Sequence, residues 1–136
     1  MHSRYLLCLG TLLLAFSVGC TGNAPKSVSG KVTLDGEPVK GGSVVFLPAD
    51  VNGTKGAAEI IDGSYLIGGD SGLKPGKYRV EISWFKPTGR KIPSADPGFT
   101  TDETREVIPA KYNTNSELKA DIGARENTHN FTLTTK

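Results

Sequence analysis

Side chains able to act as nucleophiles or soft metal ligands are scarce in this sequence. The 136 residues include two cysteines and two histidines, and Cys8 and His2 lie within the first 19 residues. A zinc site takes three or four His, Cys, Asp or Glu ligands, and a Ser-His-Asp triad would have to use His129, which has no nucleophile motif near it. We therefore expect no catalytic residue, no metal site and no cofactor.

Two short stretches offer oxygen atoms of the kind that calcium prefers. They are "DVNG" at residues 50–53 and "DGS" at residues 62–64. Neither has the ligand spacing of a calcium loop. Asp and Asn are common in tight turns because their side chains bond to nearby backbone, so we expect both stretches to be turns.

The N-terminal residues, "MHSRYLLCLGTLLLAFSVGC", carry a different kind of chemistry. Arg4 precedes an almost entirely apolar run over residues 5–16, and small residues lead to Cys20. This pattern is typical of a secretory signal peptide, and the run is too short for a good membrane span. We predict a signal peptide over residues 1–19, which leaves Cys20 as the only cysteine and excludes an internal disulfide.

Val18, Gly19 and Cys20 resemble the end of the bacterial lipoprotein lipobox. The resemblance implies that Cys20 is lipidated, that residues 20–26 form a linker, and that the exported protein is anchored in the bacterial cell envelope through its N-terminal lipid. The membrane is then a partner, at the outer membrane or a periplasmic face. Ser17 stands where the lipobox usually has leucine, and Ser17 with Gly19 also suits ordinary signal peptidase. The alternative is a soluble exported protein with a free thiol at Cys20.

Charge argues against nucleic acid as a partner. The formal net charge is only +2, and no basic run or stripe appears.

The rest of the chain shows the two-residue period of half-buried strands. In "GKYRVEISWF" the alternating face comprises Tyr78, Val80, Ile82 and Trp84. Further strands are expected in "SVSGKVTL", "SVVFLP", "ELKADIG" and "THNFTLTT", and "AAEIIDGSYLIGG" is expected to form two strands joined at Asp62–Gly63 as a hairpin. Seven or so short strands with turns between them predict an all-β, antiparallel, seven-stranded β-sandwich.

The stretches "VSGKVTLDGEPVKGGSVVFLP", "DGSYLI" and "LKPGKYRVEI", in this order, resemble the carboxypeptidase-regulatory-like, transthyretin-like (prealbumin-like) domains. The later "IPAKYNTNSELKADI" and "ENTHNFTL" resemble the pattern of small planctomycete lipoproteins built from one such domain. The resemblance covers most of residues 27–134 and implies one β-sandwich domain over residues 27–136. It implies only the accessory domain of zinc carboxypeptidases, because the sequence contains no match to the His and Glu zinc motif of their separate catalytic domain.

The long connection over residues 86–116 is the only candidate binding site. Its first part is basic and its middle is acidic, and residues 86–106 show no strand periodicity and few large apolar groups. We expect residues 86–106 to be a mobile arm facing a partner, with residues 107–113 packed on the sandwich; the alternative is a lid over an open end of the core. The candidate partner-binding residues are Lys86, Arg90, Lys91, Phe99 and Tyr112.

Three functions are compatible with these features. The first is a non-enzymatic, membrane-anchored β-sandwich with a structural or protein-binding role, whose envelope partner is a protein or a glycan. The second is a carbohydrate-binding module that uses exposed rings such as Phe85, Phe99 and Tyr112. The third, with least support in the residues, is an envelope hydrolase.

Overall fold

The computed structural model describes residues 27–125 and 127–136, so the predicted signal peptide, the linker and Cys20 lie outside the described residues. The described chain is mostly strand, which confirms the predicted all-β class. The strands are β1 (Ser27–Leu34), β2 (Glu37–Pro38), β3 (Ser43–Pro48), β4 (Gly56–Glu59), β5 (Ser64–Gly68), β6 (Gly76–Ser83), β7 (Phe85–Pro93), β8 (Thr100–Glu106), β9 (Lys119–Ile122), β10 (Asn127–Thr128) and β11 (Phe131–Leu133). Two short 3₁₀ helices, η1 (Gly69–Ser71) and η2 (Ala110–Tyr112), join them.

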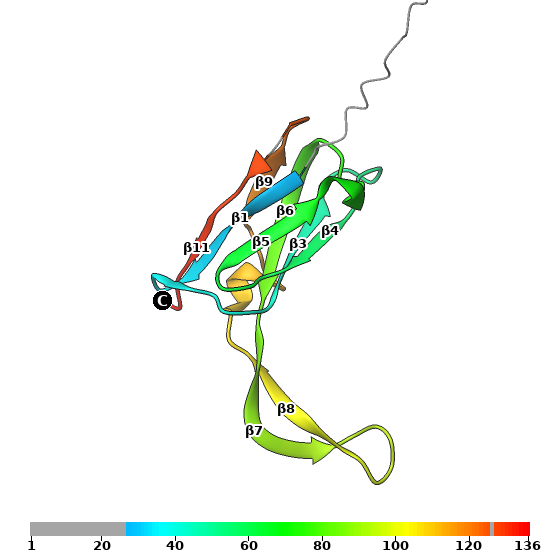
Figure 1. The fold of residues 1–136 in the computed structure, drawn as a ribbon, viewed down its shortest axis with the longest axis vertical. Helices are drawn as coiled ribbons and strands as arrows, with labels where there is room; N and C mark the ends of the chain where they lie inside the picture. The colour runs from blue at the N-terminus through cyan, green and yellow to red at the C-terminus, as the bar shows by residue number, and fades with distance from the viewer. Residues whose placement is uncertain (1–26, 126) are drawn as a thin grey trace, which may run out of the picture.

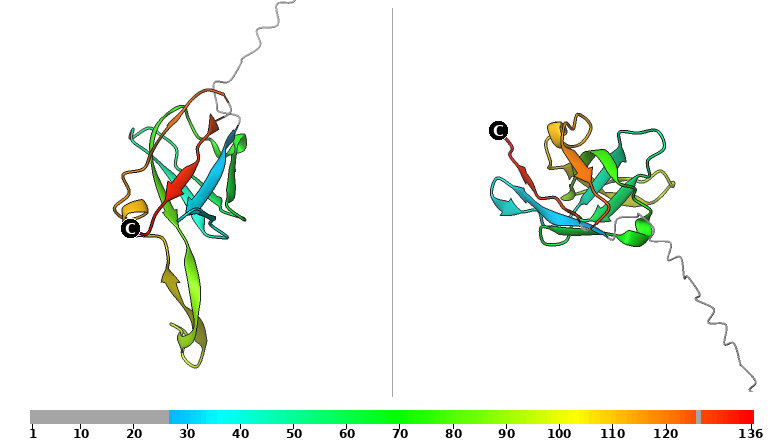
Figure 2. Two further views of the ribbon diagram at one scale, coloured as in Figure 1. Left: turned by 90° about the vertical axis from the view of Figure 1, so that its left-hand side faces the viewer. Right: turned by 90° about the horizontal axis from the view of Figure 1, so that it is seen from above.

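Nine of these strands form two sheets that pack face to face (Figures 1 and 2). In the first sheet β1 pairs with β2 and β5 antiparallel and with β10 and β11 parallel. The second sheet is antiparallel, in the order β4-β3-β6-β9. The expectation of a purely antiparallel sandwich is therefore wrong at β1. The two sheets also contain nine strands instead of the expected seven.

The core lies between the two sheets and uses the alternating residues of each strand. Val80 and Ile82 are fully buried, and Tyr78 is 3% exposed, as the period-two pattern predicts. Phe46 of β3 lies at the centre, with its ring 6.1 Å from that of Tyr65 and 6.4 Å from that of Phe131 across the sandwich. Full burial of one such side chain contributes about 1.5–3 kcal/mol, so this shared face holds the sheets together.

The turn at Asp62–Gly63 forms as predicted, but the strands on either side belong to different sheets. Ile61 and Ser64 exchange two backbone hydrogen bonds of 2.9 Å. Asp62 and Gly63 have φ values of 48° and 79°, the left-handed values of a tight hairpin turn. β4 nevertheless pairs with β3 while β5 pairs with β1. The turn therefore carries the chain from one sheet to the other, which corrects the expected simple hairpin.

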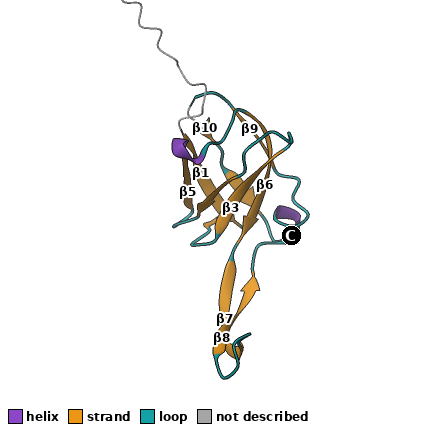
Figure 3. Cartoon of the chain, turned by 90° about the vertical axis from the view of Figure 1, so that its right-hand side faces the viewer, coloured by secondary structure: helices purple, strands orange, loops and turns teal. Residues whose placement is uncertain are grey.

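The long connection contains a separate two-stranded sheet, β7–β8, which projects away from the sandwich (Figures 1 and 3). The expectation of a connection without strands over residues 86–106 is wrong, and so is the alternative of a lid, because the hairpin does not cover the sandwich. The expectation for residues 107–113 holds: Ile108 is 3% exposed, and Tyr112 packs against the core.

The hairpin and the start of the described chain lie at opposite ends of the sandwich (Figure 1). Ser27, the first described residue, pairs with Gly68 at the end of β5. Lys74 Nζ donates to the carbonyl of Asn52 at 3.3 Å, which links the loops over residues 69–75 and 49–55 at this same end. We call Ser27 and these two loops the entry end. None of the described helices is long and apolar enough to cross a membrane.

Candidate functional site

The β7–β8 hairpin is the part of the described chain with the most exposed strand surface. All nine residues of β7 are exposed. The pairing runs from Phe85 opposite Glu106 to Pro93 opposite Thr100 and shifts between Pro87 and Lys91. Gly89 in this shift has φ +83°, a value that glycine adopts without strain. The shift leaves residues 88–90 of β7 opposite residue 103 of β8, so the regular pairing of the two strands is interrupted here.

The root of the hairpin is fixed to the sandwich by one carboxylate. Glu106 Oε1 accepts hydrogen bonds from the backbone N–H of Trp84 at 2.8 Å and of Ile108 at 2.9 Å. Val107 N–H donates to the carbonyl of Trp84 at 3.0 Å. Hydrogen bonds to a charged acceptor are stronger than neutral ones, so the hairpin leaves the sandwich in a defined direction.

Trp84 fills the corner between the hairpin and the sandwich. Its indole lies against Gly41, where an added Cβ atom would be 3.1 Å from Trp84 Nε1. Gly42 lies against the Cβ atom of Trp84, which would be 2.9 Å from a Cβ added there. Lys86 Nζ lies 3.7 Å from the ring centroid, in a cation–π contact. The predicted site residue Lys86 is therefore engaged by Trp84, which sequence reasoning had assigned fully to the core.

The charges of the two hairpin strands pair with each other. Lys91 Nζ lies 2.7 Å from Asp102 Oδ1, and Arg90 Nε lies 3.7 Å from Glu103 Oε2. Thr88 Oγ1 donates to the same Glu103 oxygen at 2.6 Å. The basic and acidic segments of the sequence thus neutralise each other across the strands. Each exposed pair contributes only about 0–1 kcal/mol.

Apolar side chains on and near the hairpin remain open to solvent. Phe99, in the tip loop, is 70% exposed, Phe85 is 60% exposed and Ile92 is 37% exposed. The tip is closed by a hydrogen bond of 2.9 Å from Ser94 N–H to the carbonyl of Phe99. Phe99 is thus a predicted site residue on an ordered turn, whereas sequence reasoning did not single out Ile92.

Tyr112 does not join the other predicted site residues. It belongs to η2, beside the end of the chain, and its hydroxyl accepts a hydrogen bond from Thr134 N–H at 3.1 Å. Hydrogen bonds from the Thr134 side chain and backbone lower the pKa of Tyr112, and nearby Lys111 adds to this effect. The structure therefore places Lys86, Arg90, Lys91 and Phe99 on one hairpin, with Lys86 at its root and Phe99 at its tip. Tyr112 lies instead at the seam between η2 and the C-terminal residues.

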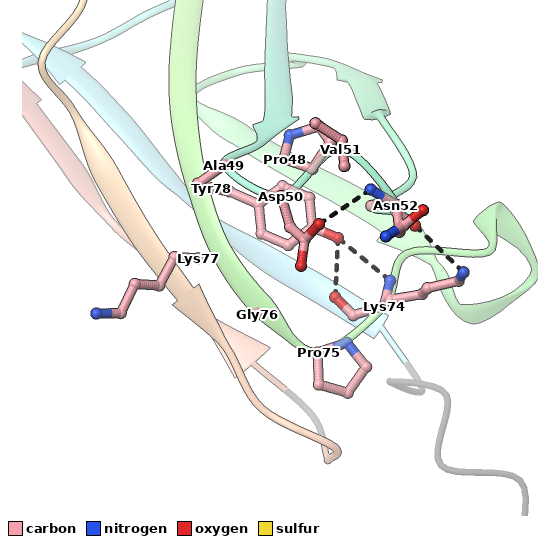
Figure 4. A pocket seen from close by; sticks show the side chains of 11 residues that line it. Pro48, Ala49, Asp50, Val51, Asn52, Lys74, Pro75, Gly76, Lys77 and Tyr78 are labelled. Carbon is pink, nitrogen blue, oxygen red and sulfur yellow. Dashed lines mark hydrogen bonds between the residues drawn. The ribbon is translucent and has the colours of Figure 1, made fainter.

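A second surface feature, which sequence reasoning missed, is a depression at the entry end (Figure 4). It has a volume of about 670 Å³. Tyr78 forms its floor, with its hydroxyl donating to the carbonyl of Lys74 at 2.8 Å. Asn52 N–H donates to Asp50 Oδ1 at 3.0 Å, which confirms the predicted turn. Pro48 and Pro75 lie on either side.

The environment of His129 is that of a packed aromatic side chain. It is half-buried, its ring centroid lies 6.4 Å from that of Phe46, and Nε2 has no hydrogen-bond partner among the described residues. Its carbonyl accepts the Tyr65 hydroxyl at 2.7 Å. Over residues 27–125 and 127–136, no three His, Cys, Asp or Glu side chains are grouped so as to hold a metal ion.

The site is thus a set of exposed apolar side chains on or beside a hairpin whose charges pair across its two strands, an arrangement suited to binding. Comparison of the chain with protein-family models finds no match, and comparison with curated proteins finds no matching sequence.

Proposed function

We propose that this chain is a non-enzymatic lipoprotein of the bacterial cell envelope, anchored through Cys20, whose β-sandwich presents the β7–β8 hairpin to a protein partner. The observation that carries the proposal is the opposite placement of the entry end and the hairpin (Figure 1). A chain held at Cys20 would have the entry end near the membrane, because only residues 20–26 separate the lipid from Ser27. The hairpin would then point away from the membrane, where a partner is accessible.

Exposed apolar groups support a protein partner. A two-stranded hairpin alone is marginally stable in water, and this one leaves Phe85, Ile92 and Phe99 uncovered within the described structure. Aromatic anchors of this kind are enriched at protein interfaces. We further propose that the sandwich is of the carboxypeptidase-regulatory-like, transthyretin-like type, since the stretches that carry that resemblance fall on β1, β3, β5 and β6.

Crosslinking in the native cells tests the partner. Proteins crosslinked to the full-length chain are compared for wild type, Phe99→Ser and the matched control Leu66→Ser, which changes an exposed residue of β5. We expect one partner to be lost with Phe99→Ser and kept with Leu66→Ser. Equal recovery from both variants would contradict a role for the hairpin tip.

Fatty-acid labelling tests the anchor. We expect the wild-type chain to incorporate a fatty-acid probe and Cys20→Ala to incorporate none. Absence of label in both proteins would favour the free-thiol alternative.

Binding of a carbohydrate is the second candidate function, because exposed rings such as Phe85 and Phe99 can stack on sugars. Trp84 is less available for this role, since Lys86 Nζ lies over one face of its ring at 3.7 Å from the centroid. A glycan array with the full-length protein separates this function from protein binding.

A further inference from the structure

The entry end carries a single large apolar side chain that points into solvent. Val51 is 97% exposed, more than any other large hydrophobic residue of the described chain. Its loop is held in shape: Asp50 accepts from Asn52 N–H through Oδ1 at 3.0 Å and from Gly53 N–H through its carbonyl at 3.0 Å. Val51 is therefore presented by a defined turn.

Cations and carboxylates lie in the two loops of the entry end and at the start of β6. Lys55, Lys74 and Lys77 are exposed, and none has an ion-pair partner within the described part of the chain. Asp50 and Asp70 are the carboxylates of the same two loops. The charges of the two loops thus balance, and Lys77 of β6 adds one amine beside the depression of about 670 Å³. The Lys74 amine lies next to Val51, because it donates to the carbonyl of Asn52 at 3.3 Å.

The length of chain between Cys20 and Ser27 limits how far the entry end can lie from a membrane that holds the lipid. Seven peptide steps from Cys20 span at most about 25 Å when extended. Such a short tether keeps the entry end at a high effective concentration next to the lipid, so a contact too weak to bind alone can still orient the domain. At a membrane surface, the methylene groups of a lysine side chain can lie along the apolar layer while the amine reaches the lipid phosphates.

We propose that the entry end rests on the phospholipid headgroup layer, with Val51 in the interface and the Lys55 and Lys74 amines beside lipid phosphates. This inference rests on the proposed anchor at Cys20. The anchor supplies the affinity for the membrane, and the entry end supplies the orientation. The hairpin thereby keeps one direction, away from the membrane, instead of changing its direction as the domain rotates about the linker.

Amine footprinting of the full-length, membrane-extracted protein tests this orientation. The protein is reconstituted in vesicles of phosphatidylcholine with phosphatidylglycerol, and lysine acylation rates are measured by mass spectrometry relative to the same protein in nonionic detergent. We expect the rates at Lys55 and Lys74 to fall several-fold in vesicles, while those at Lys40 and Lys86 stay unchanged. Val51→Asp should restore the rates, whereas the control Ile61→Asp should leave the protection intact, because Ile61 is also exposed (63%) but pairs with Ser64, at the end of β5 farthest from Ser27.

Each other outcome overturns the inference in a recognisable way. Equal protection of Lys74 and Lys86, or protection that Val51→Asp leaves intact, would show that the entry end is not the contact surface although the anchor holds. A full-length protein that does not associate with vesicles at all would overturn the anchor itself, and the orientation with it.

Discussion

Glu106 Oε1 lies 2.8 Å from the backbone nitrogen of Trp84 and accepts its hydrogen bond, which joins the last residue of the hairpin to the residue that precedes the first. The same oxygen accepts the N–H of Ile108, a residue of the core. One carboxylate thus connects both hairpin strands to the sandwich. Within residues 27–125 and 127–136, neither the Trp84 N–H nor the Ile108 N–H donates to a backbone carbonyl, so the direction of the hairpin depends on the Glu106 side chain.

Replacing this carboxylate should loosen the root of the hairpin. We expect Glu106→Ala to lower the free energy of unfolding by about 1–3 kcal/mol, the usual cost of leaving partly buried donors without an acceptor. Amide hydrogen exchange at Trp84 and Ile108 should accelerate. The matched control is Glu103→Ala, in the middle of β8, which should leave exchange at both amides unchanged; acceleration by both variants would mean that the hairpin is held along its length instead.

Gly30 should tolerate no side chain. A Cβ atom there would lie 1.8 Å from the His129 carbonyl oxygen and 2.9 Å from Tyr65 Cε1. Overpacking of this kind forces backbone movement, so Gly30→Ala should lower the unfolding free energy by about 3 kcal/mol. At Gly123 the nearest atom is 3.6 Å away, and Gly123→Ala should stay within about 0.5 kcal/mol of wild type. Urea denaturation measures both; similar losses would refute the close approach at β1.

The alternating face of β6 should separate two neighbouring substitutions. Val80 is fully buried, so Val80→Asp should cost about 2–7 kcal/mol, enough to unfold most of a domain this small. Glu81 is half-buried and pairs with Arg79 at 2.7 Å. Glu81→Gln should cost less than about 1 kcal/mol. Thermal melts of the two variants test whether Val80 faces the core while Glu81 faces away from it, and equal melting temperatures would contradict this assignment.

Tyr65 should make the fold sensitive to alkali. Burial raises the pKa of Tyr65 above its ordinary value. The folded protein therefore keeps the neutral phenol, while the unfolded chain begins to lose that proton near pH 10. Above about pH 10, stability should fall by up to about 1.4 kcal/mol per pH unit.

Two phenylalanine variants identify the tyrosine responsible. Tyr65→Phe should be less stable at neutral pH, because the His129 carbonyl loses the 2.7 Å hydrogen bond, but its stability should decline less steeply above pH 10. Tyr112 has a lowered pKa, so Tyr112→Phe should not flatten the decline. Denaturation at stepped pH values measures this, and parallel profiles for wild type and Tyr65→Phe would count against the prediction.

Alternation in the sequence predicted the buried face of β1, β6 and β11, although Leu34 at the end of β1 is only half-buried. Val28, Val32, Val80, Ile82 and Leu133 are all buried where the two-residue period assigns them, because a half-buried strand must place every second residue in the core. Trp84 is an exception. It shares the parity of Ile82 but is only half-buried, because the chain leaves the sandwich at this residue.

Sheet partners did not follow from local pattern. Asp62 and Gly63 specify the turn through their left-handed backbone, but they do not specify that β5 pairs with β1. That choice depends on contacts between residues far apart in the sequence. The parallel pairing of β1 with β11 is of the same kind.

The hairpin escaped prediction because neither of its faces is buried. Hydrophobic and polar residues alternate in a strand because one of its faces packs on a core, and all of β7 is exposed. The remaining signals were the β-branched threonines Thr100, Thr101 and Thr104, which favour strands, and charges of opposite sign on the two halves. The candidate residues Arg90 and Lys91 belong to this segment, but their pairing with Glu103 and Asp102 could be found only from the register of the two strands.

The parallel pairing of β1 with β11 also sets the order in which the protein can fold. Val32 of the first strand is in register with Phe131 near the end of the chain, and Asp35 accepts hydrogen bonds from Thr135, 100 residues later. Closing so long a loop is entropically costly and slow. The first sheet therefore cannot be completed on a growing chain before residues 131–135 have been synthesised, and until then β1 lacks its parallel partner.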